Sequence, residues 1–249
     1  ELKKLSDRIR KKNPEIKIQI SKSIPSKVIS KKPQDKKKLT AITETNQTTE
    51  YKKITSTDEL DKIISDIYEM GNFVFDVETD SLNIIEAHLI GISICNNTNT
   101  SYYIPLQHLD GDNVKIEDQI DFKIFLKKIK PVMEDESIVK IGHNIKYDIA
   151  ILKKYEIETV TYEDTMLMSY ICDANVNRHN MDDLAKIHLN TETTKFKEVV
   201  GSGKSQITFD RVNIDLATKY AAEDAEITYK LFKILSKRVF HEKNKFVYE

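Results

Sequence analysis

The stretch FVFDVETDSL, residues 73–82, is the most informative part of the sequence for the fold. Its first three residues are apolar, and its fourth is an aspartate. Phenylalanine and valine at its start are typical of a buried β-strand, which we expect over residues 72–78. Side chains alternate along a strand, so Asp76 and Glu78 are expected to project from the same face. The sequence therefore predicts two neighbouring carboxylates on an otherwise apolar strand.

This pair of carboxylates indicates a metal site. Like charges repel each other and are costly to remove from water, so a bound cation is the simplest compensation. Oxygen ligands suit Mg²⁺ or Mn²⁺, whereas zinc usually recruits histidine or cysteine. A strand end that carries ordinary surface acids explains Asp76 and Glu78 equally well when they are considered alone.

A second polar group lies in the stretch GHNIKYD, residues 142–148. A short apolar strand is expected to end at its glycine, and a helix is expected to begin a few residues later. Asp148 would lie in the first turn of that helix, where an acid also interacts favourably with the helix dipole. Asn144 and Tyr147 suit contacts to a sugar, base or phosphate, and we assign His143 no catalytic role.

A third group lies in the stretch YAAED, residues 220–224, inside a long helix that we expect over about 213–239. Tyr220 and Asp224 are four residues apart and therefore share one helix face. The two alanines between them keep the helix slim, which allows another element to approach closely. A half-buried tyrosine beside a surface aspartate is the common alternative.

The remaining pattern predicts an α/β fold. Strands are expected at 72–78, 88–95, 101–105 and 137–141, and helices at 57–70, 119–134, 146–154, 163–173, 180–189 and 213–239. Three consecutive strands, followed by strands that alternate with helices, predict a mixed central sheet flanked by helices. The polar, glycine-containing stretch 190–212 is expected to be a mobile loop.

The composition is that of a globular domain with a basic N-terminal segment. The 249 residues are 39% hydrophobic and 32% charged, and the apolar runs are too short for a transmembrane helix. Residues 1–40 hold 14 Lys and Arg against 4 Asp and Glu, whereas the other 209 residues hold 25 against 36. We expect residues 1–52 to be a basic, flexible tail or linker and 53–249 to be the folded domain. The lysines suit a role near nucleic acid, and a solvated linker shaped by codon usage explains them as well.

Together the three polar groups resemble the exonuclease motifs of the DEDD superfamily. Their order is D-x-E, then N-x-x-x-D about 70 residues later, then Y-x-x-x-D about 76 residues further on. Tyrosine four residues before the last aspartate marks the tyrosine subclass. The stretches FDVETDSL, GHNIKYD, RHNMD, GSGKSQITF and YAAEDA further resemble the proofreading domain of bacterial-type family A DNA polymerases. This resemblance spans about residues 54–240 and implies an RNase H-like exonuclease fold.

The resemblance implies a 3′–5′ exonuclease that uses two divalent cations, Mg²⁺ or Mn²⁺, and no small-molecule cofactor. The metal ligands that it implies are Asp76, Glu78, Asp148 and Asp224. Tyr220 would orient the attacking water together with Glu78, because a phenol is a poor general base at neutral pH. The implied substrate is the 3′ end of single-stranded DNA, and no membrane is involved.

The resemblance also implies which residues contact the DNA. Leu82 and Phe196 match apolar positions that wedge against the terminal bases, a use consistent with base stacking, although core packing explains them as well. Polar contacts to the last nucleotides are implied for Thr79, Asn144, Tyr147 and Arg178.

The resemblance also implies a larger protein around this domain, in which the partner is a polymerase domain of the same polypeptide. An amino-acid composition rich in lysine, asparagine and isoleucine indicates an AT-rich genome. Together with the motifs, this composition makes the chain similar to the exonuclease domains of apicomplexan plastid polymerases. That similarity implies an apicoplast location. Cys95 and Cys172 favour two buried thiols in a reducing compartment over a disulfide.

Two alternative functions stay open. An RNase D-like 3′–5′ exoribonuclease would use the same metal chemistry on a different sugar. A catalytically inactive module that binds DNA belongs to a different class. The five signature residues that the resemblance implies as catalytic, Asp76, Glu78, Asp148, Tyr220 and Asp224, are all intact and argue against it.

Overall fold

A six-stranded mixed sheet forms the centre of the fold. The structure is a computed structural model that describes residues 49–97, 99–174, 178–242 and 244–248. The strands are β1 (Glu50–Lys53), β2 (Asn72–Thr79), β3 (Leu89–Cys95), β4 (Thr100–Pro105), β5 (Val139–Gly142) and β6 (Tyr162–Asp164). Their order is β1-β4-β3-β2-β5-β6. Strand β3 runs antiparallel to both of its neighbours, and the other pairs are parallel.

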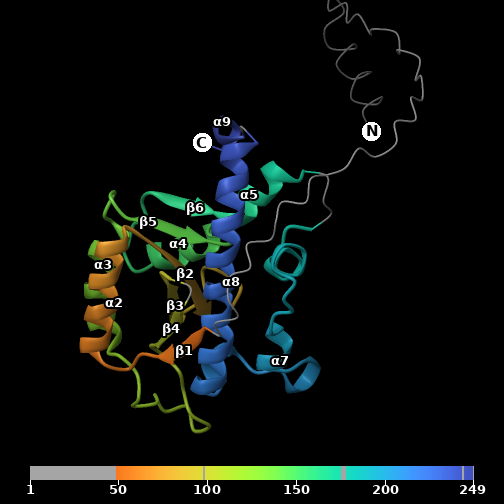
Figure 1. The fold of residues 1–249 in the computed structure, drawn as a ribbon. Helices are drawn as coiled ribbons and strands as arrows, with labels where there is room; N and C mark the ends of the chain where they lie inside the picture. Colours follow the sequence, from red (N-terminus) through yellow and green to blue (C-terminus); the bar gives the residue numbers. More distant parts are fainter. Residues whose placement is uncertain (1–48, 98, 175–177, 243, 249) are drawn as a thin grey trace, which may run out of the picture. The chain divides into compact units, whose positions relative to one another are not determined.

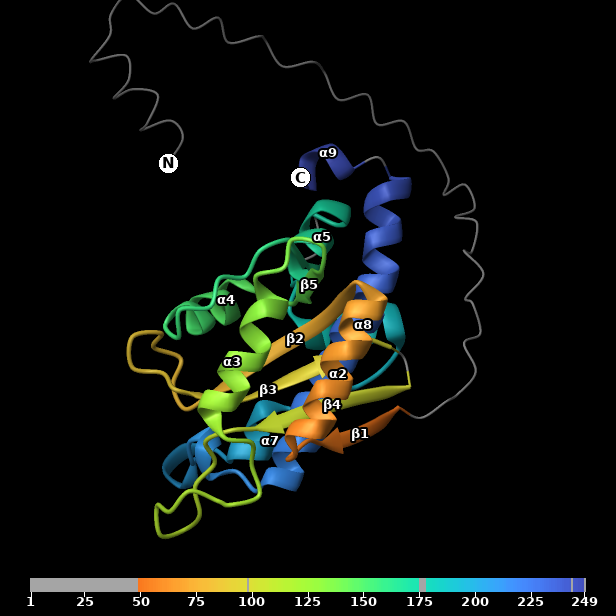
Figure 2. The same cartoon turned by 90° about the vertical axis from the view of Figure 1, so that its left-hand side faces the viewer.

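Helices cover both faces of this sheet (Figures 1 and 2). They are α2 (Thr57–Met70), α3 (Phe122–Met133), α4 (Lys146–Lys153), α5 (Thr165–Cys172), α6 (Met181–Leu184), α7 (Phe196–Val200), α8 (Ile214–His241) and α9 (Lys245–Tyr248), with shorter helical turns at Ala185–Leu189, Gly203–Ser205 and Phe209–Arg211. Helices α2 and α3 pack together on one face, and α8 crosses strands β1 to β5 on the other. The predicted α/β fold with a mixed sheet and flanking helices is confirmed. None of the described helices is long and apolar enough to cross a membrane.

The alternation of side chains along β2 decides which residues meet α8. Phe73, Phe75 and Val77 point into the large core that α2 and α3 complete. Val74 points the other way and packs against Ala225 of α8. Because the period of a strand is two residues, the even-numbered Asp76 and Glu78 share the face of Val74. The apolar residues of β2 thus fix the direction of its acidic ones.

The sheet begins earlier than the sequence predicted. Residues 1–48 of the predicted tail lie outside the described residues, but Glu50–Lys53 form β1 and pair in parallel with β4. The hydroxyl groups of Thr49 and Tyr51 both donate to the carboxylate of Glu226 on α8. Residues 50–52, which the prediction placed in the tail, thus belong to the sheet, and Tyr51 binds a partner 175 positions away in the sequence.

The stretch 190–212, predicted as a loop, carries helix α7 and two short helical turns instead. Its apolar residues Val199, Val200, Phe209 and Val212 are buried against α8. Burial of this apolar surface stabilises the segment although its local sequence is polar and contains two glycines. Strand β6, only three residues long, was not predicted either.

Gly91 of β3 leaves space for a buried tyrosine, and we expect Gly91→Ala to destabilise the fold. A methyl group at Gly91 would lie 2.1 Å from the hydroxyl oxygen of Tyr103, which is fully buried. Overpacking of this kind lowers the free energy of unfolding by about 1–3 kcal/mol. Urea denaturation measures the change. Gly111→Ala is the control, because nothing lies within 4 Å of a methyl group there; equal losses in both variants would contradict the packing argument.

Buried His108 makes a second, pH-dependent contribution to stability. Its Nε2 lies 2.8 Å from the hydroxyl oxygen of Tyr103 and its Nδ1 lies 3.1 Å from the carbonyl oxygen of Val212. Burial lowers the pKa of His108 from 6.5 to about 4. The group is neutral in the folded chain at pH 7, so its contribution is complete above pH 6.5 and is lost as the pH falls toward 4.

Between those two pH values the unfolded chain binds a proton that the folded chain does not. The contribution of His108 to the free energy of unfolding should therefore fall by about 1.4 kcal/mol for each unit by which the pH is lowered. We expect the pH slope of His108→Gln to be smaller than that of the unsubstituted chain by this amount, measured by urea denaturation from pH 7 to 4. Exposed His241 supplies the control His241→Gln, whose slope should match that of the unsubstituted chain.

Candidate active site

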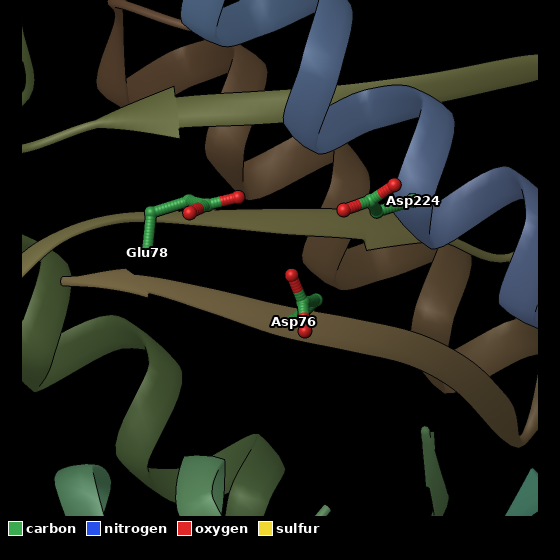
Figure 3. A group of neighbouring side chains, drawn as sticks. All are labelled: Asp76, Glu78 and Asp224. Atoms are coloured by element: carbon green, nitrogen blue, oxygen red, sulfur yellow. The ribbon is translucent and has the colours of Figure 1, made fainter. Parts of the chain in front are cut away.

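Three carboxylates converge between the sheet and α8. Asp76 and Glu78 come from β2, and Asp224 comes from α8. Each offers one oxygen, and these three atoms lie within 4.8 Å of one another. Figure 3 shows the three carboxylates directed toward the space between the strand and the helix. The close approach of α8 follows from Ala221 and Ala222, which are fully buried where the helix crosses the sheet.

The electrostatics of this cluster favour a cation. Burial, and after it the charges of the neighbouring carboxylates, raise the pKa of Glu78 and Asp224 well above the usual range. Burial raises the pKa of Asp76 to about 7. Within the described part of the chain, Glu78 Oε1 and Asp224 Oδ1 are buried and have no hydrogen-bond partner. Unpaired buried carboxylate oxygens are costly, and oxygen-only donors fit a divalent ion such as Mg²⁺.

Asp148 lies beside this cluster rather than in it. It stands in the first turn of α4, is 4% exposed, and its Oδ1 accepts a hydrogen bond from the backbone N–H of Val77 at 3.0 Å. Burial and the charge of Asp76 raise its pKa, and the Val77 hydrogen bond opposes them. The turn before α4 is held by Asp164, whose carboxylate accepts from the backbone N–H groups of Asn144 and Ile145 at 3.0 and 3.2 Å.

Tyr220 lies one helical turn before Asp224 and faces the same site. Its pKa is raised by burial first and by the charge of Asp224 next, so the hydroxyl group keeps its proton. The ring packs against those of Phe209 and Phe196, with centroid distances of 6.1 Å in both cases. A protonated phenol in this position can donate a hydrogen bond to a substrate oxygen or a water but cannot accept its proton.

Two of the residues predicted to contact DNA, Thr79 and Tyr147, bind the loop after β2 in this structure. The hydroxyl oxygens of Thr79 and Tyr147 lie 2.7 Å apart, and both groups donate to the carbonyl oxygen of Ser81, at 3.0 and 2.6 Å. The next residue, Leu82, is 90% exposed. Core packing, the alternative explanation for Leu82, is therefore wrong, and its side chain is free to meet a ligand.

The other three predicted contacts lie on three different elements. Phe196 is 44% exposed and its ring lies nearly parallel to that of Phe209, at 6.3 Å and 7°. Asn144 has a left-handed backbone, with φ of 60°, at the turn before α4. Arg178 is exposed on the segment that precedes α6. The structure thus brings Asp76, Glu78 and Asp224 together, with Asp148 and Tyr220 beside them, and it places the predicted DNA contacts on several separate elements.

Two residues that position the site, Asp164 and Phe209, received no role from the sequence, although the stretches DTM and GSGKSQITF that contain them resemble the family. Asp164 holds the turn before α4 and also accepts from the backbone N–H of Met166 at the start of α5. An aspartate before a helix is a common N-cap, and this local pattern could have identified it. Phe209 supports Tyr220, but a single aromatic residue in a polar stretch carries no comparable signal.

Comparison with known proteins agrees with this geometry. The pattern of a 3′–5′ exonuclease family of DNA polymerase A matches residues 51–239. DNA polymerase I of Rhizobium leguminosarum is 40% identical over 194 residues, which cover 72% of this chain and 19% of that protein. The chain therefore spans about a fifth of the length of this relative.

Two solved structures show the same fold at low identity. Brucella melitensis NrnC with bound Mg²⁺ has a TM-score of 0.52 and 20% identity, and the match covers 72% of this chain and 78% of that one. Escherichia coli RNase D, an exoribonuclease, has a TM-score of 0.58 and 14% identity, covering 78% and 46%. The family match, the polymerase relative and the fold together show that this chain belongs to the 3′–5′ exonucleases of the DNA polymerase I family.

Proposed function

We propose that this domain removes nucleotides from the 3′ ends of single-stranded DNA and thereby proofreads for a polymerase on the same polypeptide. The observation that carries the proposal is the cluster of three converging carboxylates beside Tyr220, in which two buried oxygens lack partners among the described residues. Such a cluster is unfavourable without a cation, and hydrolysis of a phosphodiester is the reaction that divalent ions in oxygen sites support.

Asp76, Glu78 and Asp224 would hold one divalent ion, and Asp148 would take part in holding a second. Bound there, the ions would supply a water of lowered pKa and stabilise charge on the leaving 3′-oxygen. Mg²⁺ and Mn²⁺ both fit the donor set, and the Mg²⁺ bound to the related fold of Brucella NrnC supports the first.

The chain's own residues would position the reactants. The Tyr220 hydroxyl group and the carboxylate of Glu78 would orient the attacking water toward phosphorus. Leu82 and Phe196, both exposed, would pack against the last bases, and Asn144 and Arg178 would contact the sugar-phosphate backbone. Thr79 and Tyr147 would act partly through Ser81, since their hydroxyl groups already bind its carbonyl oxygen.

DNA is the proposed substrate because the relative that is 40% identical is a DNA polymerase. RNase D shares the fold at 14% identity and is an exoribonuclease, so RNA is the competing substrate. Digestion of a 5′-labelled single-stranded DNA and of its RNA counterpart, in the same Mg²⁺ buffer, tests the choice. We expect faster digestion of DNA, with loss of one nucleotide at a time from the 3′ end; faster digestion of RNA would overturn the proposal.

We also propose an apicoplast location for the protein. It is supported by the lysine-, asparagine- and isoleucine-rich sequence and by the motif resemblance. The relative named above is bacterial, which gives the plastid no support. Microscopy of the tagged full-length protein in the source organism tests the location.

A further inference from the structure

The loop that joins β2 to β3 presents three large apolar side chains to solvent, of which Ile84 is the least exposed at 39%. Leu82 is 90% exposed and Ile85 is 86% exposed, whereas Ala87, between them and β3, is fully buried. Exposed apolar side chains that lie close together mark contact surfaces more often than isolated ones do. The loop follows directly after Glu78 and Thr79 in the sequence, and the carbonyl oxygen of Ser81 accepts a hydrogen bond from Tyr147, the neighbour of Asp148.

This loop is held in one conformation by hydrogen bonds at both ends. At its start, Asp80 accepts from the backbone N–H of His88 at 2.7 Å and pairs with the ring of His88 at 2.8 Å. In its middle, the carbonyl oxygen of Asn83 accepts from the backbone N–H groups of Glu86 and Ala87, at 3.0 and 2.8 Å. A side chain at the end of α4 adds the remaining contacts.

That side chain is Lys154, the C-cap residue of α4. Its ammonium group donates to the carbonyl oxygens of Ile84 at 2.8 Å, Ile85 at 3.1 Å and Ala87. A lysine has three N–H donors, so all of them are directed to this one loop. Lys154 makes no ion pair among the described residues, which distinguishes it from Lys153, whose Nζ lies 3.8 Å from a carboxylate oxygen of Glu158.

Helix α4 thereby links the apolar surface to the metal site. Tyr147 in its first turn binds Ser81, and Lys154 binds the loop seven residues later, which is the same helix face. Asp148 in the same first turn faces the carboxylate cluster. A displaced or disordered loop would lose the fixed relation between Leu82, Ile85 and the position of the scissile phosphate.

We propose that Lys154 is a positioning residue: it fixes the loop Ser81–Ala87 so that Leu82 and Ile85 together form a surface for the terminal bases of the DNA. The inference rests on the proposed function. Bases that pack on this surface remove its apolar side chains from water, and a loop ordered in advance avoids the entropic cost of ordering it on binding.

The test compares two variants at Lys154 and one at Lys153 in an Asp224→Asn background, in which hydrolysis is slow. The dissociation constant for a short single-stranded DNA is measured in Mg²⁺ at several salt concentrations. Lys154→Met keeps the aliphatic chain and removes the donors, and we expect about tenfold weaker binding. Lys154→Arg retains donors and should restore most of the affinity. Lys153→Ala removes the same charge one residue away and should leave the affinity unchanged.

Two outcomes distinguish positioning from a direct phosphate contact. If Lys154 acts through the loop, its substitution should have no effect once Leu82→Ala and Ile85→Ala are present, and the salt dependence of binding should stay the same. A phosphate contact would instead lower the salt slope by about one. A lower salt slope, or an undiminished effect in the Leu82→Ala, Ile85→Ala background, overturns the inference. Digestion of DNA by the unsubstituted chain tests the proposed function separately.

Discussion

Asp224→Asn is expected to lower the rate of DNA digestion in Mg²⁺ by on the order of 10³-fold and at the same time to stabilise the metal-free protein. The loss of rate follows because a ligand to the catalytic ion contributes several kcal/mol of charge stabilisation in the transition state. The gain in stability follows because Asp224 is 5% exposed, faces Asp76 and Glu78, and leaves one oxygen without a partner.

The sign of the stability change is fixed by the direction of the pKa shift. A carboxyl group whose pKa is raised in the folded state either binds a proton at pH 8 or stays charged at a cost in free energy. In the unfolded chain at the same pH, the group is a solvated anion. The neutral amide removes this cost, and we expect the free energy of unfolding in EDTA to rise by about 0.5–2 kcal/mol. In Mg²⁺ the order should invert, because the ion stabilises only the chain that binds it.

Urea denaturation in EDTA and in Mg²⁺, together with digestion of a labelled single strand, measures both changes. Asp215→Asn is the matched control, since Asp215 lies on the same helix with a side chain that is 82% exposed. Its rate and stability should stay close to those of the unsubstituted chain. Full digestion by Asp224→Asn, or an EDTA stability no higher than that of the unsubstituted chain, would show that the cluster is not the metal site.

The sequence predicted this cluster because each contribution follows a short-range rule. Alternation along β2 places Asp76 and Glu78 on one face, and helical periodicity places Tyr220 and Asp224 on one face. What the sequence could not supply is the approach of α8 to β2, which results from packing across the whole sheet. The family resemblance supplied that step.

The errors occurred where distant residues decide the structure. Tyr51 and β1 depend on Glu226, which is far away in the sequence. Phe209 is buried by α8 although its neighbours are polar. The local sequence of both segments favours a tail or loop, and burial against α8 outweighs that preference. Thr79 and Tyr147, which the sequence predicts to contact DNA, show a related limit, because their hydroxyl groups bind the loop at Ser81, which no spacing in the sequence reveals.

Tyr220→Phe is expected to lower kcat by on the order of 10²-fold, with little change in KM for single-stranded DNA. The hydroxyl group is the only part removed, so the ring keeps its packing against Phe209 and Phe196. An interaction that orients water contributes in the transition state and little to substrate binding, so its loss appears in kcat. Steady-state digestion over a range of DNA concentrations separates the two constants.

Tyr220→Ala distinguishes the hydroxyl group from the ring. It removes a largely buried aromatic side chain, so the free energy of unfolding should fall by about 3–5 kcal/mol, and KM should rise if Phe196 loses its support. Tyr68→Phe, on α2 at the opposite face, removes a hydroxyl group from a side chain that is 48% exposed and should change neither constant. If Tyr220→Phe keeps full kcat while Tyr220→Ala loses it, the residue acts by packing alone. Orientation of the water would then fall to Glu78, the only other group to which the proposed mechanism gives that task.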